Sequence, residues 1–322
     1  MCLDEYRHLA RALNTPPMFA DLLTLIVRPN EVNILLLLAE REMSTDELSK
    51  LLKIPLNEVE QKVKSLFFKG LLKRRREGRV VYYTRSFRSI IDRYLSEGRG
   101  EVFGKYATAL AEYLMEDHVN RARSNPYPGS RVLPIPEAAI EPVSIVLPYE
   151  NAVDILKRAK SISIRDCECR VTYRNCDKPL RTCLGLNEFS QELVDRGVAE
   201  EISFQEAKDV LSIANESGLV HQALYSDWVR GEVFDICSCC PCCCTYLRTL
   251  LRHGVKHRVA KSGFVAKVNE EKCIGCGNCV NRCVFQARII GNGKVKVVEE
   301  NCYGCGLCTT SCPTGAAVLV FS

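Results

Sequence analysis

Three successive stretches near the N-terminus carry apolar residues at helical spacing. They span residues 31–40, 44–52 and 57–69. Within each stretch the apolar residues recur every three or four positions, which places them on one face of an α-helix. Ser44 followed by Glu47 forms a capping box at the start of the second stretch. The pattern therefore predicts three consecutive helices.

Two β-like runs follow the third helix, at residues 71–77 and 79–84, with a turn at Glu77 and Gly78. The order of three helices and a hairpin resembles the winged helix-turn-helix domains of small bacterial and archaeal regulators, over about residues 20–90. Because a fold does not fix a function, the resemblance implies either a DNA-binding domain or a domain that docks on another protein.

Some charges of this region favour DNA binding and others oppose it. The third helix, which would enter a DNA groove, opens with Asn57, Glu58 and Glu60. Carboxylates repel phosphate, although a glutamate can read cytosine. Five basic side chains of the hairpin suit contacts with phosphate groups: Lys73, Arg74, Arg75, Arg76 and Arg79. We expect protein docking and keep DNA binding as the alternative.

A fourth helix is expected over Glu101–Arg123, where it packs on the preceding helices or mediates a homodimer. Six of the 13 prolines then fall within residues 125–148. Proline lacks an amide hydrogen and fixes φ, so this stretch is expected to be extended rather than helical. It separates the first domain from the next.

Short helical and strand-like patterns alternate in the middle of the chain and predict an α+β domain over residues 149–260. A helix is expected at residues 151–160 and a strand at residues 162–165. A further helix begins after a capping box at Ser203 and ends at Gly218.

This middle domain contains ten cysteines in two groups, too many to be explained as small buried apolar residues. They are Cys167, Cys169, Cys176, Cys183, Cys237, Cys239, Cys240, Cys242, Cys243 and Cys244. Neighbouring cysteines cannot all face one site, so Pro241 is expected to turn the chain. Four thiolates hold one cubane cluster, so we expect one iron–sulfur cluster here. A second cluster, a zinc ion and a non-cubane cluster with more than four ligands remain as alternatives. His221 is expected to be structural.

The order of these cysteines, C-x-C-R followed by two single cysteines and C-S-C-C-P-C-C-C, resembles a family of cysteine-rich regions. Such regions stand ahead of ferredoxin domains in multidomain iron–sulfur proteins of anaerobes. The resemblance implies metal binding and redox work.

The C-terminal part contains one cysteine spacing twice. Residues 273–283 read C-I-G-C-G-N-C-V-N-R-C and residues 302–312 read C-Y-G-C-G-L-C-T-T-S-C, and the second copy begins 29 residues after the first. Four thiols within eleven residues suit neither the paired spacing of zinc sites nor a disulfide framework. The glycines between the cysteines allow tight turns around a metal cluster.

The repeat resembles bacterial-type ferredoxin domains, which carry two [4Fe–4S] clusters and in which the fourth cysteine of each motif binds the cluster of the other motif. Val284 departs from the family pattern, which has a proline there, as Pro313 is in the second copy. The resemblance implies two ligand sets: Cys273, Cys276, Cys279 and Cys312 for one cluster, and Cys302, Cys305, Cys308 and Cys283 for the other.

Composition and charge indicate the cellular compartment in which the protein works. The 322 residues include 19 cysteines, and their odd number and adjacent placement favour free thiolates in a reducing compartment. No signal pattern stands at the N-terminus, and no apolar run is long enough to span a bilayer. We expect a cytoplasmic protein of an anaerobe without membrane contact. Its net charge of +5 arises in residues 1–100, which hold 18 Lys and Arg against 13 Asp and Glu.

These patterns predict a multidomain α+β protein. Its parts are a winged-helix-like domain with its following helix (1–123), a proline-rich linker (124–148), a cysteine-rich metal-binding domain (149–260) and a dicluster ferredoxin fold (261–322). Neither a nucleotide-binding glycine motif nor a catalytic triad is present, so no catalytic residue is assigned. We expect an iron–sulfur electron-transfer protein or subunit that relays low-potential electrons to or from a partner redox enzyme. Two alternatives are a redox-sensing DNA-binding regulator and a redox enzyme with a catalytic cluster in the middle domain.

Overall fold

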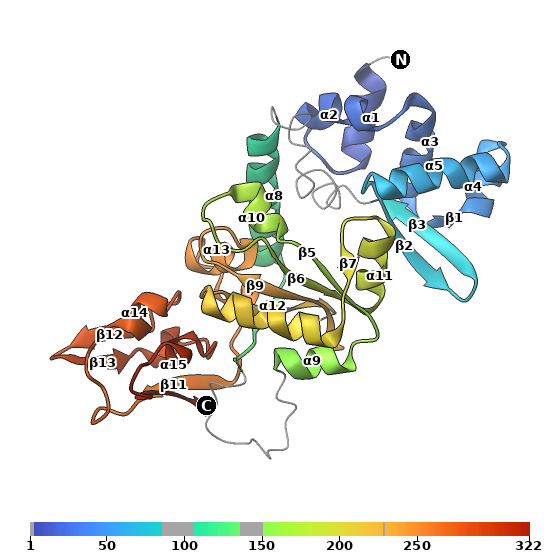
Figure 1. The fold of residues 1–322 in the computed structure, drawn as a ribbon. Coiled ribbons are helices and arrows are strands. Elements are labelled where there is room, and N and C mark those ends of the chain that lie inside the picture. The colour runs from blue at the N-terminus through green and yellow to red at the C-terminus, as the bar shows by residue number, and fades with distance from the viewer. Residues whose placement is uncertain (1–2, 86–105, 136–150, 228) are drawn as a thin grey trace. The chain divides into compact units, whose positions relative to one another are not determined.

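The computed structural model describes residues 3–85, 106–135, 151–227 and 229–322, which form a mixed α+β chain (Figure 1). The chain divides into two compact units. The first unit contains Met1–Glu112 and Asp195–Val198, and the second contains Tyr113–Val194 and Ala199–Ser322.

The first unit combines helices with a small antiparallel sheet of order β1-β3-β2 (Figure 1). The three predicted helices and the hairpin are confirmed, and the side chains of Ser44 and Glu47 cap α4 reciprocally as predicted. The elements are α1 (Leu3–Ala12), α2 (Ala20–Ile26), α3 (Val32–Glu40), β1 (Met43–Ser44), α4 (Thr45–Leu52), α5 (Leu56–Phe68), β2 (Leu72–Glu77) and β3 (Val80–Arg85).

A buried carboxylate ties the start of α3 to the end of α5. Glu31 is 1% exposed, and its Oε2 lies 2.6 Å from Nζ of Lys69. Ser65 donates a hydrogen bond of 2.8 Å to the other carboxylate oxygen. The charge of Glu31 is therefore both paired and hydrogen-bonded, which a buried carboxylate requires.

The second unit is built on a seven-stranded sheet of order β10-β4-β8-β9-β6-β5-β7. All neighbours in it are antiparallel except β10 and β4. The strands are β4 (Ser130–Val132), β5 (Ile162–Asp166), β6 (Arg181–Leu186), β7 (Glu200–Glu201), β8 (Val220–Asp227), β9 (Glu232–Cys239) and β10 (Val259–Ala260).

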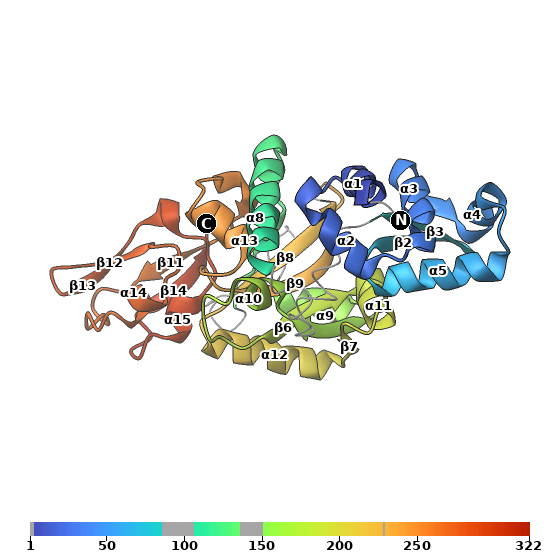
Figure 2. The same cartoon turned by 90° about the horizontal axis from the view of Figure 1, so that it is seen from above.

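Helices cover both faces of this sheet, and Figure 2 shows α12 on one side and α13 on the other. Residues of α9 and α12 pack on one face against side chains such as Leu184 and Ile236, and residues of α13 pack on the opposite face with Val220. The helices are α8 (Ala107–Ser124), α9 (Ala152–Arg158), α10 (Glu168–Tyr173), α11 (Asn187–Asp195), α12 (Phe204–Glu216) and α13 (Thr245–Leu251).

The expectations for this region are largely confirmed. The predicted strand and both predicted helices are β5, α9 and α12, and Ser203 with Glu206 forms the expected capping box. The helix expected over 101–123 is α8, while residues 101–105 lie outside the described residues. In the described part of the proline-rich stretch the chain is not helical, and Ser130–Val132 form β4. Residues 136–148 of that stretch are not described.

The C-terminal residues repeat one small motif twice. Strand β11 (Phe264–Val268) pairs with β14 (Ala317–Phe321), and β12 (Arg288–Gly291) pairs with β13 (Lys294–Val297). Two short helices, α14 (Asn278–Arg282) and α15 (Leu307–Thr310), hold equivalent places in the two copies. This region shares one apolar core with α13 and the sheet.

The described chain offers no single helix that is long and apolar enough to cross a membrane. Residues 20–26 and 29–40 reach that length and composition only as a pair, and they are bent by 100° at the break between them.

Candidate metal centres

Two glycine-containing loops shape the C-terminal cysteine motifs. Gly275 and Gly304 occupy equivalent positions and share a φ of 67°, a backbone conformation that favours glycine. A Cβ atom at position 275 would lie 2.1 Å from the carbonyl oxygen of Gly293, and one at position 304 would lie 2.3 Å from that of Phe264. Each loop therefore requires glycine for space as well as for its dihedral angles.

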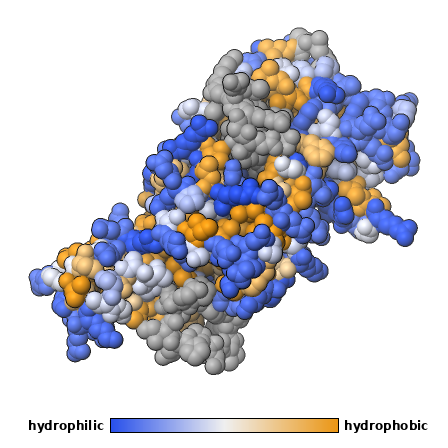
Figure 3. Space-filling model, viewed as in Figure 1, coloured by the Kyte–Doolittle hydropathy of each residue, from blue (hydrophilic) through white to orange (hydrophobic). Residues whose placement is uncertain are grey.

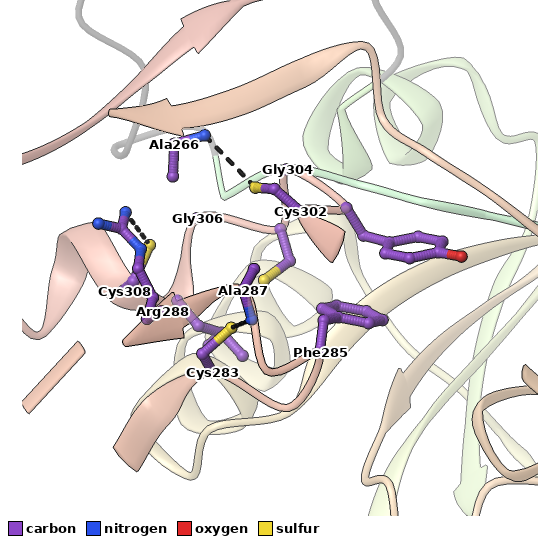
Figure 4. A pocket seen from close by; sticks show the side chains of 12 residues that line it. Ala266, Cys283, Phe285, Ala287, Arg288, Cys302, Gly304, Gly306 and Cys308 are labelled. Atoms are coloured by element: carbon purple, nitrogen blue, oxygen red, sulfur yellow. Dashed lines mark hydrogen bonds between the residues drawn. The ribbon is translucent and has the colours of Figure 1, made fainter. Parts of the chain in front are cut away.

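The fourth cysteine of each motif lies beside the other motif. Cys283 lines a small cavity with the three cysteines of the second loop, Cys302, Cys305 and Cys308 (Figure 4). In the first loop, Cys279 has Cys276 and Cys312 as its electrostatic neighbours. The fold thus brings together two sets of thiols, each drawn from both copies of the repeat.

Hydrogen-bond donors point at the sulfur atoms of these cysteines, as Figure 4 shows for one set. The backbone N–H of Ala266 donates to Sγ of Cys302 over 3.4 Å, and that of Ala287 donates to Sγ of Cys283 over 3.3 Å. Such donors stabilise thiolates that hold a metal and tune its properties.

Burial favours the neutral form of two thiols of the second loop, Cys305 and Cys308. It raises the pKa of Cys305 well above its usual range and raises that of Cys308 to about 11, although the nearby Arg288 guanidinium opposes the second shift. Deprotonation of such thiols at neutral pH requires a positive metal core. The cavity, its four thiols and its donors therefore fit a cluster of iron and sulfide.

Four of the ten cysteines in the middle region form a compact group. These are Cys176, Cys240, Cys242 and Cys243, and all four sulfur atoms lie within 4.8 Å of one another. The Sγ atom of Cys176 is 3.7 Å from that of Cys240 and 3.8 Å from that of Cys243, and the sulfurs of Cys242 and Cys243 are 3.9 Å apart. This group could hold a metal.

Other cysteines of the middle region do not belong to this group. The six are Cys167, Cys169, Cys183, Cys237, Cys239 and Cys244, and all are free thiols. The sequence placed the ten cysteines in two groups along the chain, whereas the structure draws members of both groups into a set of four and a set of six.

His221 is structural, as expected from the sequence. Its ring is 2% exposed, and its nitrogens lie 3.0 Å from Oγ of Ser238 and 2.6 Å from Oδ1 of Asn215. Both nitrogens are therefore used in hydrogen bonds, and neither is left for a metal.

Sequence reasoning missed two buried arginines beside the cysteines. Arg288 is 3% exposed and donates a hydrogen bond of 3.0 Å to Sγ of Cys308. Arg170 is 1% exposed, and its charge acts on the thiols of Cys167, Cys183, Cys239 and Cys240. The only signal for Arg170 was its position directly after Cys169, and Arg288 had none.

Comparison with known protein families agrees with the geometry of the C-terminal region. Residues 266–319 match the family described as 4Fe-4S dicluster domain. No curated protein matches the chain. A dicluster domain implies two [4Fe–4S] clusters, and it suggests iron–sulfur electron transfer.

Proposed function

We propose that this chain is an electron-transfer protein or subunit that relays low-potential electrons between a donor and a partner redox enzyme. The observation that carries the proposal is the placement of Cys283 among the cysteines of the second motif, Cys302, Cys305 and Cys308. Shared ligands of this kind hold the two clusters of bacterial-type ferredoxins close together. When bound, each [4Fe–4S] cluster takes up and releases one electron at a time.

The cysteine ligands and the hydrogen-bond donors beside them determine where those electrons are stabilised. We assign Cys273, Cys276, Cys279 and Cys312 to one cluster and Cys302, Cys305, Cys308 and Cys283 to the other. Each Sγ carries negative charge once a metal is bound, and amide donors and the Arg288 guanidinium offset it.

An exposed apolar patch lies beside the first cysteine loop and suits the docking of a redox partner. Ile274 of this loop is 66% exposed and Ile290 of β12 is 52% exposed, and Cδ1 of Ile290 would lie 3.3 Å from a Cβ atom at Gly277. Figure 3 shows an orange group at the left end of the view. Cys276 of the same loop is also exposed. A partner seated here would come close to the first ligand set, which shortens the path of the electron.

We propose a structural zinc ion for Cys176, Cys240, Cys242 and Cys243. A tetrahedral ion bound at about 2.3 Å to each sulfur requires sulfur–sulfur distances of about 3.8 Å. The observed distances of 3.7, 3.8 and 3.9 Å match this value. The sequence favoured a cubane cluster for the middle cysteines, but sulfurs this close together suit a single ion better.

The first unit fits protein docking better than DNA binding. Arginines of its hairpin are engaged by carboxylates: Arg74 is paired with Asp195, and Arg75 contacts Glu42 at 2.8 Å and Glu77 at 3.0 Å. Glu58 and Glu60 lie in the first turn and a half of α5, as predicted.

The described cysteines are free thiols, and a reducing compartment such as the cytoplasm suits them.

The proposal is tested by rapid mixing of the anaerobic holoprotein with one-electron mediators. We expect fast reduction by a low-potential reduced viologen and fast reoxidation by a mediator of higher potential, with one electron for each C-terminal cluster. Slow exchange with every mediator, or electrons accepted only in pairs, would contradict an electron carrier.

A redox-sensing DNA-binding regulator is the second candidate, because helices α3, α4 and α5 precede a basic hairpin. A gel-shift titration across salt concentration, on oxidised and reduced protein, separates the two. The electron carrier predicts weak binding that ignores DNA sequence. Nanomolar binding to one sequence that changes with redox state, with a salt dependence that flattens when Arg74, Arg75 and Arg76 become alanine, would favour the regulator.

A further inference from the structure

Six cysteines outside the zinc group form a closed ring of thiols. Each thiol interacts with the thiol before it and the thiol after it in the ring. In order around the ring they are Cys167, Cys169, Cys244, Cys239, Cys237 and Cys183. Four of them, Cys167, Cys183, Cys239 and Cys244, are buried.

The sheet gathers these residues from distant parts of the sequence. Strand β6 lies between β5 and β9, so Cys183 on β6 is flanked by Cys167, directly after β5, and by Cys237 on β9. Side chains two residues apart share one face of a strand, so Cys237 and Cys239 point the same way. Leu184 and Ile236 pack under α9 and α12 on the other face. The ring therefore lies on the face opposite those helices.

The ring is too open for a single metal ion. Among the described residues, only the zinc group has three or more ligand atoms that all lie within 4.8 Å of one another. A tetrahedral zinc ion brings its sulfurs to about 3.8 Å from one another, and a trigonal copper(I) ion would likewise bring three sulfurs together. Neighbouring thiols of the ring are close in pairs, but no three are close together.

Pairwise contact without close triplets suits iron bridged by sulfide. In [2Fe–2S] clusters each iron takes two cysteine thiolates, and in [4Fe–4S] clusters each takes one. Sulfide ions supply the remaining ligands. The cysteine sulfurs then surround the cluster instead of crowding around one ion, as the ring does.

A buried cation faces the ring and is not satisfied by hydrogen bonds alone. The guanidinium of Arg170 donates to the carbonyl oxygen of Ser238 over 2.9 Å and to the Thr182 hydroxyl. Its buried Nε has no hydrogen-bond partner among the residues that the structure describes, and its charge acts on ring thiols that include Cys167, Cys183 and Cys239. A buried charge needs a counter-charge, and thiolates bound to metal would supply one.

Polar groups also point at the sulfurs of the ring. Gln222 is fully buried, and its Nε2 lies 3.8 Å from Sγ of Cys244. The hydroxyl of Ser130 fixes the orientation of this amide by donating to its oxygen over 2.8 Å. The hydroxyl of Thr245 lies 3.7 Å from Sγ of Cys169. Donors such as the Gln222 amide stabilise thiolates.

We propose that Cys167, Cys169, Cys183, Cys237, Cys239 and Cys244 hold an iron–sulfur cluster with more than four thiolate ligands. This site is separate from the zinc group and from the two C-terminal clusters. It goes beyond the proposed function because it concerns what the ring binds, whichever way electrons flow through the chain.

The test is iron, acid-labile sulfide and zinc analysis of the full-length protein purified without oxygen. Two C-terminal clusters account for about eight irons and about eight sulfides. We expect at least about ten irons per chain, with sulfide above about eight, and about one zinc. Cys183→Ser should lower iron and sulfide towards about eight and leave zinc unchanged. The matched variant Cys176→Ser should lose zinc and keep the extra iron.

Three results would overturn the proposal. They are an iron content of about eight in the wild type with six reactive thiols in the ring, zinc or copper in the ring without extra sulfide, and ring cysteines joined as disulfides. Native mass spectrometry and alkylation of the wild-type protein give these answers even where Cys183→Ser does not fold. The EPR signals of the C-terminal clusters are a separate readout, so failure of the electron-carrier function is distinguishable from failure of the ring site.

Discussion

Nη2 of Arg288 lies 3.0 Å from Sγ of Cys308 and donates a hydrogen bond to it. The same guanidinium acts electrostatically on Cys279, which belongs to the other set of cysteines. Arg288 is buried, and its Nη1 has no hydrogen-bond partner within the described residues. One positive charge therefore serves both ligand sets, and nothing at Ala317, the equivalent position of the second copy, balances it.

Replacing Arg288 with glutamine should lower the reduction potential of both clusters. A positive charge favours the more negative reduced state, so its loss makes reduction harder. A unit charge a few ångströms away changes each one-electron step by roughly 2–4 kcal/mol, on the order of 100 mV. We expect the larger decrease for the cluster at Cys308, measured by EPR-monitored redox titration.

Lys267→Gln is the matched control for this prediction. It removes the same charge from β11, but Lys267 is an exposed partner of Glu299 and is screened by water. We expect a change below about 20 mV. Equal changes in the two variants would show that Arg288 acts through net charge and not through its position.

Gly304→Ala should prevent assembly of the second cysteine loop. The new Cβ would lie 2.2 Å from Oγ of Ser262 and 2.3 Å from the carbonyl oxygen of Phe264, and backbone atoms cannot move aside cheaply. We expect a loss of more than about 3 kcal/mol of stability and about half of the C-terminal iron. Gly315→Ala has a similar φ of 63° but open space around it, so it should cost only about 1 kcal/mol. Melting temperature and iron content compare the two, and equal losses would refute the steric explanation.

Cys283→Ser should damage the cluster of the second motif and spare that of its own motif. Cys283 lies in the cavity of Cys302, Cys305 and Cys308, so serine removes a ligand there. EPR of the reduced protein should lose the magnetic coupling between two clusters and keep one signal. Cys312→Ser is the mirror variant: it should damage the cluster of the first motif and spare that of the second. Damage confined to the cluster of Cys273, Cys276 and Cys279 in Cys283→Ser would reverse the ligand assignment.

The buried ring of His221 should make the folded protein less stable in mild acid than at neutral pH. Burial lowers the pKa of His221 from 6.5 to about 4, so the folded state favours the neutral ring. The free energy of unfolding is therefore unaffected by His221 above pH 6.5, and it decreases as the pH falls from 6.5 towards 4. At pH 5.5 the loss is roughly 1 kcal/mol, or a few degrees in melting temperature. His221→Gln should show a smaller decrease between pH 7.5 and pH 5.5, and an unchanged decrease would contradict the assignment.

Local signals in the sequence predicted much of this fold. Ser44 and Ser203 begin helices through contacts with residues three positions away, so their capping boxes could be recognised directly. The cysteine repeat could also be recognised within short stretches of sequence, and it predicted the loops of the C-terminal region. The turn at Asn292 and Gly293, with φ of 52° and 72°, joins β12 to β13.

The division of the middle cysteines could not be predicted in the same way. Cys239 and Cys240 are adjacent, yet they face different sites because side chains alternate at the end of β9. Cys183 joins Cys237 only because β6 pairs with β9, a contact between residues far apart in the sequence. Apart from its position directly after Cys169, no local pattern distinguishes Arg170 from a surface arginine.

Potentiometric titration of the anaerobic holoprotein, followed by EPR, tests the central claim most directly. The account predicts that two C-terminal clusters each accept one electron below about −300 mV and show mutual magnetic coupling when both are reduced. A protein that carries its full iron but accepts no electron in this range, or whose reduced clusters show no coupling, would contradict a low-potential electron carrier built on shared cysteine motifs.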